Sequence, residues 1–167
     1  MPKHRLAVVG AGQFGKNHCR VVHESVRAEL CAVVDTDAVR AAESAALYQA
    51  EALTDFLELA GKVDAAVVAV PTTSHEAVAI PLLEAGIDVL VEKPIAPDME
   101  SAGRMVEAAE RYGRILQVGH LERFNPAVVE LERVDIVRHR LVQSIVEAYG
   151  GAESTGDSES AGEGGAV

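Results

Sequence analysis

Residues 5–15 read RLAVVGAGQFG, a short valine-rich apolar run that passes directly into three glycines. Gly10, Gly12 and Gly15 have the spacing G-x-G-x-x-G, and a helical pattern begins among them at Gln13. In such a strand–loop–helix unit, the first glycine permits a tight turn and the second lets the backbone approach a pyrophosphate. The third lets helix and strand pack closely. The stretch therefore predicts a dinucleotide-binding loop, with a purely structural glycine turn as the alternative.

The same alternation of apolar runs and helical patterns continues to about residue 120. Strands that are apolar throughout, with helices between them, are typical of a parallel sheet covered on both faces. We therefore predict an α/β fold, a doubly wound parallel sheet of the Rossmann type, over residues 1–120. The predicted strands are 5–10, 28–35, 63–71, 88–94 and 114–120, and the predicted helices are 13–26, 38–49, 74–86 and 98–113.

The pattern changes after His120. Residues 121–150 predict a connecting helix that begins near Asn125-Pro126, followed by the start of a truncated second domain. Residues 151–167 are acidic, rich in glycine and serine, and contain no aromatic or basic residue. Such a segment has little apolar surface to bury, so we expect a disordered tail.

Composition narrows the possible partners and compartments. The chain has 167 residues, 49% hydrophobic content and a mean hydropathy of +0.12, enough for one ordinary core. A net charge of −11 argues against nucleic acid or an anionic membrane as the main partner. The first apolar run is too short for a signal peptide and no stretch approaches a membrane span, so we expect a cytoplasmic protein. Cys19 and Cys31 form no metal-type cluster and are expected to be small buried residues, with no metal site.

An acidic residue stands at the end of the second predicted strand. Asp35 follows the glycine motif by about 20 residues, where an acid meets the adenosine ribose hydroxyls of NAD. The same carboxylate would repel the 2′-phosphate of NADP. The sequence therefore favours NAD, although Arg40 lies close enough to leave NADP open.

Polar residues also follow the other predicted strands. In an open α/β sheet, ligands bind beyond the carboxyl ends of the strands, so these residues are candidates for one site. Each has a plainer interpretation: Ser74 as a helix cap, His75 as a solvated first-turn residue, and Glu92 with Lys93 as members of structural ion pairs. The three groups are Pro71-Thr72-Thr73-Ser74-His75, Glu92-Lys93-Pro94 and Gln117-Val118-Gly119-His120.

Taken together, these segments resemble the Gfo/Idh/MocA family of NAD(P)-dependent oxidoreductases over about residues 4–130. The Glu-Lys-Pro triplet is the most specific feature of the resemblance. The segment GHLERFNPA is most similar to members that act on nucleotide-linked amino sugars, of the UDP-N-acetylglucosamine 3-dehydrogenase type. The matching segments are GAGQFGKNH, Asp35, VPTTSHEAVAIPLLEAGIDVLVEKPIA and QVGHLERFNPAV.

The resemblance implies a role for each matching position. Lys93 would lie beside the nicotinamide and the reacting hydroxyl, and would take the hydroxyl proton while the hydride leaves for the nicotinamide. The Lys93–Pro94 bond is implied to be cis or otherwise constrained. The residues implied to contact the cofactor are Gly10, Gly12, Gln13, Phe14 and Gly15 in the glycine loop, Asp35, and on the nicotinamide side Pro71, Thr72, His75, Glu92, Lys93 and Pro94, with His120 and Arg123 nearby.

Family members continue into a second α/β domain that supplies most substrate contacts and usually the oligomer interface. The structured residues expected after His120, about thirty, are too few for such a domain. Three interpretations remain. The chain is a truncated sugar dehydrogenase that binds the dinucleotide, or a working enzyme whose missing half comes from a second-domain chain, or a non-catalytic nucleotide-binding regulatory or interaction module; a homo-oligomer is left open. For the first two, the expected substrate is a sugar or a nucleotide-linked sugar.

Overall fold

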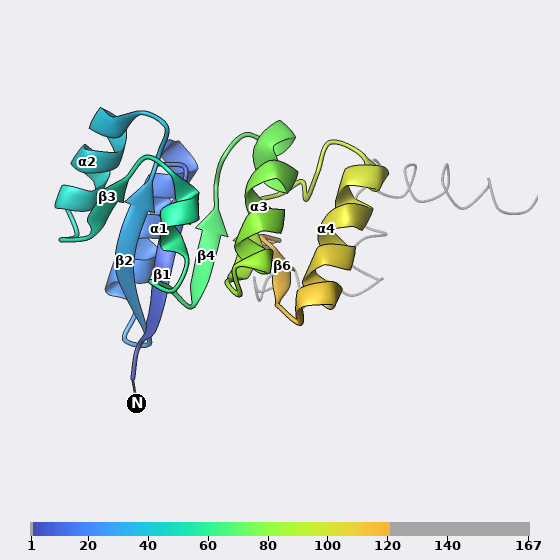
Figure 1. Ribbon diagram of the computed structural model, residues 1–167. Helices are drawn as coiled ribbons and strands as arrows, with labels where there is room; N and C mark the ends of the chain where they lie inside the picture. Colours follow the sequence, from blue (N-terminus) through green and yellow to red (C-terminus); the bar gives the residue numbers. More distant parts are fainter. Residues whose placement is uncertain (1, 121–167) are drawn as a thin grey trace, which may run out of the picture. The chain divides into compact units, whose positions relative to one another are not determined.

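A six-stranded parallel sheet forms the centre of the computed structural model, which describes residues 2–120 (Figure 1). The strand order is β3-β2-β1-β4-β5-β6, and each neighbouring pair is parallel. The chain winds outward from β1 to one edge, returns to the centre at β4, and winds outward to the other edge. This topology confirms the predicted doubly wound fold. The strands are β1 (His4–Val9), β2 (Ala28–Val34), β3 (Glu51–Leu53), β4 (Ala65–Val68), β5 (Asp88–Val91) and β6 (Leu116–Val118).

Helices cover both faces of the sheet. Successive strand residues point to opposite faces. Val8 of β1 accordingly packs with residues of α1 and α2, whereas its neighbours Ala7 and Val9 pack with residues of α3 and α4. In Figure 1, α3 and α4 lie side by side. The helices are α1 (Gln13–Glu24), α2 (Ala38–Ala46), α3 (His75–Glu84) and α4 (Met99–Tyr112), with short 3-10 turns η1 (Phe56–Leu59) and η2 (Thr72–Ser74).

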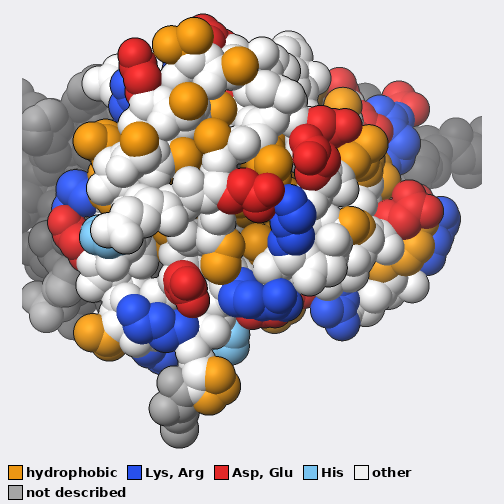
Figure 2. All heavy atoms as spheres, turned by 60° about the vertical axis from the view of Figure 1, so that its left-hand side comes forward, with side chains coloured by type: hydrophobic (Ala, Val, Ile, Leu, Met, Phe, Trp, Pro, Cys, Tyr) orange, Lys and Arg blue, Asp and Glu red, His pale blue; other side chains and the backbone are white. Residues whose placement is uncertain are grey.

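The core is built from small and branched side chains. Val8, Val33 and Val68, in the neighbouring strands β1, β2 and β4, are fully buried. Valine suits a pleated strand because its branched side chain packs well there, and burying one stabilises the fold by about 1.5–3 kcal/mol. On the outside, Figure 2 shows apolar side chains scattered among neighbouring acidic and basic ones, on the side that bears α2 and β3.

Three short elements were not predicted from the sequence. β3 and η2 have three residues each and η1 has four, too few for a periodic pattern to emerge. The strand predicted over 63–71 is also shorter, since β4 ends at Val68, and the residues after it lead to the site described below. The predicted helix and truncated domain start at 121–150, and the predicted tail at 151–167, lie outside the described residues.

Candidate functional site

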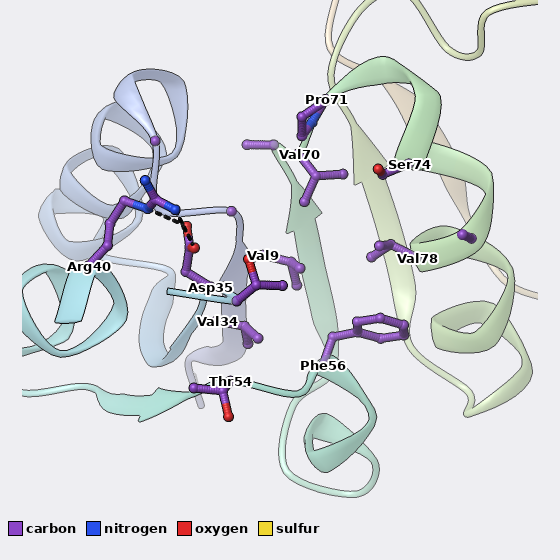
Figure 3. Close-up of a pocket in the computed structure, with 15 residues that line it drawn as sticks. Val9, Val34, Asp35, Arg40, Thr54, Phe56, Val70, Pro71, Ser74 and Val78 are labelled. Carbon is purple, nitrogen blue, oxygen red and sulfur yellow. Dashed lines mark hydrogen bonds and ion pairs between the residues drawn. The ribbon is translucent and has the colours of Figure 1, made fainter. Parts of the chain in front are cut away.

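A pocket of about 630 Å³ opens at the carboxyl ends of β1, β2 and β4 (Figure 3). β1 and β4 are neighbours in the sheet, and the chain reverses its direction of winding between them. Open α/β sheets bind their ligands at such a reversal point. The charged side chains that line the pocket are Asp35 and Arg40, and its apolar wall includes Val9, Val34, Phe56, Val70 and Val78.

Gly10 and Gly12 of the glycine loop line this pocket. Gly10 has a φ of +96°, and a Cβ there would lie 2.6 Å from the carbonyl oxygen of Ala69, so only glycine fits. A Cβ on Gly15 would collide with the carbonyl oxygen of Gly10, which explains how α1 approaches β1 so closely. A Cβ on Gly12 would meet nothing within 4 Å. The backbone at Gly12 is therefore open to a ligand, as its position in the motif predicts.

The first turn of α1 also has no side-chain cap that would compete with a ligand. Gly12 is the N-cap residue and provides no side-chain hydrogen bond to the helix. The N–H groups of a first helical turn have no partner within the helix, and with the helix dipole they attract an anion. Gln13 and Phe14 lie in this turn and are exposed, Phe14 at 65%. Their predicted cofactor contacts stay predictions.

Asp35 lies directly after β2 and is only 8% exposed. One of its oxygens, Oδ2, accepts a hydrogen bond from the backbone N–H of Ala11 in the glycine loop (2.8 Å). The other, Oδ1, accepts from the backbone N–H of Asp37 (2.9 Å). The guanidinium of Arg40 donates to both oxygens, from Nε to Oδ2 at 3.0 Å and from Nη2 to Oδ1 at 2.9 Å (Figure 3).

These contacts keep the Asp35 carboxylate ionised despite its burial. Burial by itself raises the pKa of Asp35, because it disfavours the charged form. The hydrogen bonds from Arg40 and from the backbone N–H groups of Asp37 and Ala11 act in the opposite direction and prevail, so the pKa lies below its ordinary value. The pocket therefore contains a fixed negative charge beside the glycine loop.

The segment after β4 contributes Pro71 and Ser74 to the pocket wall. Thr72 is half-buried in η2. Ser74 is the N-cap residue of α3, which confirms its expected position as a helix cap, but a capping role for its side chain is wrong, because that side chain makes no capping hydrogen bond.

His75 is buried at 1% exposure, so its interpretation as a solvated first-turn residue is also wrong. Its Nε2 lies 3.0 Å from the carbonyl oxygen of Val70, and its Nδ1 lies 3.1 Å from those of Pro94 and Ile95. The ring thus ties the end of β4 to the segment that follows β5. His75 does not line the pocket, and its predicted contact with the cofactor stays a prediction.

The Glu-Lys-Pro triplet follows β5 at the same edge of the sheet. Glu92 is held by His18 of α1, with His18 Nε2 and Glu92 Oε1 2.7 Å apart, and it also accepts a hydrogen bond from the backbone N–H of Lys93 (3.2 Å). Lys93 itself is exposed. Among the hydrogen bonds found within residues 2–120, none involves its side-chain ammonium. The Lys93–Pro94 bond is cis, as the resemblance implies.

The structure divides the predicted residues into two groups. Gly10, Gly12, Asp35 and Pro71 share one pocket. The Glu-Lys-Pro triplet lies beyond β5 and does not line that pocket. His120 follows β6 and is exposed, and Arg123 lies outside the described residues.

Sequence reasoning did not find His18, although a signal was present. His18 follows Gly15 by one helical turn, so the two residues share a face of α1. On this face His18 meets Glu92, which follows directly after β5. Phe56 was missed for a different reason, because it follows the unpredicted strand β3.

The two cysteines fit an interior role only in part. Cys19 is fully buried, which raises the pKa of its thiol to about 11, and it packs in the core as predicted. Cys31 is half-buried, and both thiols are free. Within residues 2–120, no three His, Cys, Asp or Glu side chains come together as metal ligands, and no helix is long and apolar enough to cross a membrane.

Comparison with known proteins agrees with this geometry. Residues 4–120 match the Gfo/Idh/MocA family, described as an oxidoreductase family with an NAD-binding Rossmann fold. The chain is 42% identical over 134 residues to inositol 2-dehydrogenase 4 of Saccharopolyspora erythraea, a match that covers 77% of this chain and 40% of that protein. The chain thus spans well under half the length of this relative.

Solved structures show the same partial overlap. UDP-N-acetylglucosamine 3-dehydrogenase GnnA from Acidithiobacillus ferrooxidans matches with a TM-score of 0.74 and 33% identity, over 81% of this chain and 44% of that one. GenD2 from gentamicin A biosynthesis, solved in complex with NAD, matches with a TM-score of 0.67 and 34% identity, over 71% of this chain and 35% of that one. From the family match over residues 4–120 and these likenesses, the chain belongs to the Gfo/Idh/MocA family of oxidoreductases and carries its NAD-binding Rossmann fold.

Proposed function

We propose that the chain binds NAD in this pocket and forms the dinucleotide-binding part of an enzyme that oxidises a secondary hydroxyl of a sugar or a related cyclic polyol. The observation that supports it best is the hydrogen bond from the Ala11 N–H to Asp35, at 2.8 Å. It joins the loop suited to a pyrophosphate to the carboxylate suited to a ribose, within one pocket.

The residues present fit the parts of NAD in order along the sheet edge. Gly12 and the start of α1 would hold the pyrophosphate, because the backbone there is open and its N–H groups attract anions. Asp35 would accept hydrogen bonds from the adenosine ribose hydroxyls, and its charge favours NAD over NADP. Pro71, Thr72 and the Glu-Lys-Pro triplet would lie on the nicotinamide side.

Lys93 is the candidate for the proton in this reaction. A bound nicotinamide supplies the hydride acceptor. The hydroxyl of the substrate must lose its proton as its carbon loses the hydride. The exposed amine of Lys93, which has no hydrogen-bond partner within residues 2–120, would receive that proton at Nζ.

Glu92 and His18 would hold Lys93 in place. The 2.7 Å contact between these two side chains fixes the Glu92 carboxylate against α1, and that carboxylate accepts the N–H of Lys93. The backbone of the lysine is thereby tied to the helix that begins at the glycine loop. The lysine and the pyrophosphate site are in this way connected through one helix.

The substrate class follows from the relatives. Those described above are named for inositol and for UDP-N-acetylglucosamine, and both compounds carry secondary hydroxyls on a six-membered ring. Two other candidate functions are a dinucleotide-binding half that works with another chain and a nucleotide-binding module without chemistry.

Calorimetric titration of the purified chain with NAD tests the binding part of the proposal. NAD should bind and should raise the unfolding temperature, because it binds the folded state alone. Failure of NAD to bind or to stabilise the chain contradicts the proposal.

Turnover is tested by NADH absorbance, with NAD and either myo-inositol or UDP-N-acetylglucosamine. NADH formation by the chain alone supports a self-sufficient oxidoreductase. Activity that appears only after a chain carrying a second domain is added supports the shared arrangement. Binding without turnover in both mixtures supports the non-catalytic module.

A further inference from the structure

Within residues 2–120, the hydrogen-bond contacts of the buried His75 ring are with carbonyl oxygens alone. Its Nε2 lies 3.0 Å from the oxygen of Val70, and its Nδ1 lies 3.1 Å from those of Pro94 and Ile95. These distances are typical of N–H···O hydrogen bonds. A carbonyl oxygen can only accept, so each of the two ring nitrogens faces a group that requires a donor.

A neutral imidazole cannot satisfy both sides of this arrangement. It carries one N–H, and its other nitrogen has a lone pair in place of a proton. In either neutral form of His75, that lone pair would point at a carbonyl oxygen in a site that is only 1% exposed, where water does not replace the missing hydrogen bond. The imidazolium donates from both nitrogens, and hydrogen bonds from a charged donor are the stronger ones.

The charge of such a ring would be met by the dipoles of the carbonyl groups, since the nearby carboxylates have other partners. Glu76, the next residue on α3, accepts a hydrogen bond from Arg104 of α4 (Nη2 to Oε2, 2.9 Å), and Glu92 is in contact with His18. β4 and η2, which also pack against α3, contain no charged residue, and the charged residue of β5, Asp88, lies at its amino end. The other charged groups on the surrounding segments are Glu58 on η1, Lys93 after β5, and Asp98, Glu100 and Arg104 at the start of α4.

The three carbonyl groups belong to two segments of the site. Val70 lines the pocket after β4. Pro94 and Ile95 come directly after Lys93. Among the hydrogen bonds found within residues 2–120, those that reach the Pro94 and Ile95 carbonyl oxygens come from the His75 ring. The ring therefore links the wall of the pocket to the backbone that follows the lysine.

We infer that His75 is a positioning residue, which carries a proton on both ring nitrogens and, by donating from each, ties the backbone after Lys93 to the pocket wall. The inference rests on the proposed function, because Lys93 has its role there. Glu92 precedes the lysine and is in contact with His18, so the lysine lies between two segments held by histidines from different helices. Loss of one ring proton would release either the pocket wall or the segment after Lys93.

The protonation of the ring is tested by NMR of the full chain with isotopically labelled histidine, at a pH about one unit above the ordinary histidine pKa of about 6.5. One imidazole should show two slowly exchanging ring N–H protons, because both are buried in hydrogen bonds. Both signals should disappear together in His75→Gln or His75→Asn, which assigns them. The same chain in concentrated urea is the reference, and should show neither. A single ring N–H for His75 identifies a neutral ring and overturns the inference.

The two variants also separate the two sides of the ring. The amide nitrogen of asparagine lies near the place of Nδ1, and that of glutamine near the place of Nε2. His75→Asn should therefore keep the link to Pro94 and Ile95, and His75→Gln should keep the link to Val70. The measurement is the NMR order parameter of the Lys93 and Ile95 backbone N–H groups, expected at about 0.85 in the parent chain. It should fall below about 0.6 in His75→Gln and stay near the parent value in His75→Asn.

Calorimetric titration with NAD should show the opposite order. NAD binding should weaken by roughly threefold to tenfold in His75→Asn, the equivalent of one hydrogen bond, because the link to Val70 in the pocket wall is lost. It should change little in His75→Gln. His23→Gln is the matched control, since His23 is an exposed histidine in the last turn of α1, and it should alter neither measurement.

The outcomes distinguish the inference from the proposed function. A chain that shows both ring N–H protons and the contrast in order parameters, but does not bind NAD, overturns the proposed function and leaves the histidine link as a feature of the fold. A chain that binds NAD but has one ring N–H on His75, or equal loosening in both variants, overturns the inference alone. Two ring N–H protons, with loosening at Lys93 confined to His75→Gln, support it.

Discussion

The two ends of the parallel sheet each carry an aspartate paired with an arginine, and of these two pairs the one at the carboxyl end lines the pocket described above. At the carboxyl end, Arg40 Nη2 lies 2.9 Å from Asp35 Oδ1, and the aspartate side chain is 8% exposed. At the amino end, Arg5 Nη2 lies 2.7 Å from Asp64 Oδ1, and that aspartate side chain is 44% exposed. The same chemical pair thus occurs in two environments.

The difference in burial and surroundings shows that the role of an aspartate–arginine pair depends on its position in the fold. Asp64 accepts the backbone N–H of Arg5 and links β1 to the start of β4, in contact with water, where an ion pair adds little to stability. Asp35 is buried beside a glycine loop whose backbone is open to a ligand. We therefore expect changes at the carboxyl end to alter binding and chemistry, and changes at the amino end to leave both unaltered.

The largest expected effect follows from Lys93→Met. Loss of the proton acceptor should lower kcat for a ring alcohol by roughly 10²–10⁴-fold, in the mixture in which the parent chain is active. The dissociation constant of NAD should change little, because the pocket residues are untouched. Lys62→Met is the matched control, since Lys62 pairs with exposed Glu51 near the amino end. Equal loss of activity in both variants would remove the distinction between the two ends.

Gly15→Ala is expected to have the next largest effect. The added Cβ collides with the Gly10 carbonyl oxygen, which should lower the free energy of unfolding by about 2 kcal/mol and weaken NAD binding by roughly a hundredfold. Gly103→Ala is the control, because a Cβ on that helical glycine meets nothing within 4 Å. It should raise the free energy of unfolding by about 0.5–1 kcal/mol, as measured by urea denaturation.

Asp35→Asn and Asp64→Asn compare the two pairs directly. Asparagine is nearly the same size as aspartate but has no charge, and it offers one acceptor oxygen in place of two. NAD binding should weaken by roughly tenfold in Asp35→Asn, since hydrogen bonds to a charged group are the stronger ones. Calorimetry should show no change in Asp64→Asn. A similar weakening in both variants would contradict a binding role for Asp35.

Much of the site was predictable because it depends on local patterns. The glycine spacing and the end of the valine-rich β2 placed Gly10, Gly12, Gly15 and Asp35 from the sequence, since strand, loop and helix follow one another along the chain. β3 has only three residues, which is too short for a recognisable sequence pattern. The position of Phe56 in the pocket, shortly after β3, could therefore not be predicted.

The remaining features arise from contacts between distant segments. His18 meets Glu92 across 74 residues, and His75 is buried by carbonyl groups of a segment about twenty residues away. The proximity of Arg40 to Asp35 is visible in the sequence. The bidentate pairing that fills the carboxylate depends on the orientation of a long side chain, which no pattern of residues encodes.

The smallest expected effect is on the free energy of unfolding at acidic pH. The aspartates at both ends of the sheet, Asp35 and Asp64, should contribute to it. The pKa of Asp35 is lowered because hydrogen bonds from Arg40 and the backbone outweigh burial, and the pKa of Asp64 is lowered chiefly by the hydrogen bond from Arg5. A folded-state pKa below the unfolded value of 3.8 means that the unfolded chain binds more protons in this range.

The two carboxylates therefore stabilise the folded chain fully above about pH 4, and this contribution is lost as the pH falls through their folded-state values. Urea denaturation at several pH values should show a free energy of unfolding that declines less steeply in acid for each Asp→Asn variant than for the parent chain. The same denaturation series at saturating NAD distinguishes the Asp35–Arg40 pair from the Asp64–Arg5 pair. Because the nucleotide binds only the folded state and uses the Asp35 carboxylate, its added stabilisation should fade in acid in the parent chain and in Asp64→Asn alike. In Asp35→Asn that fading should be weaker, and an equally strong decline there would show that Asp35 does not meet the nucleotide.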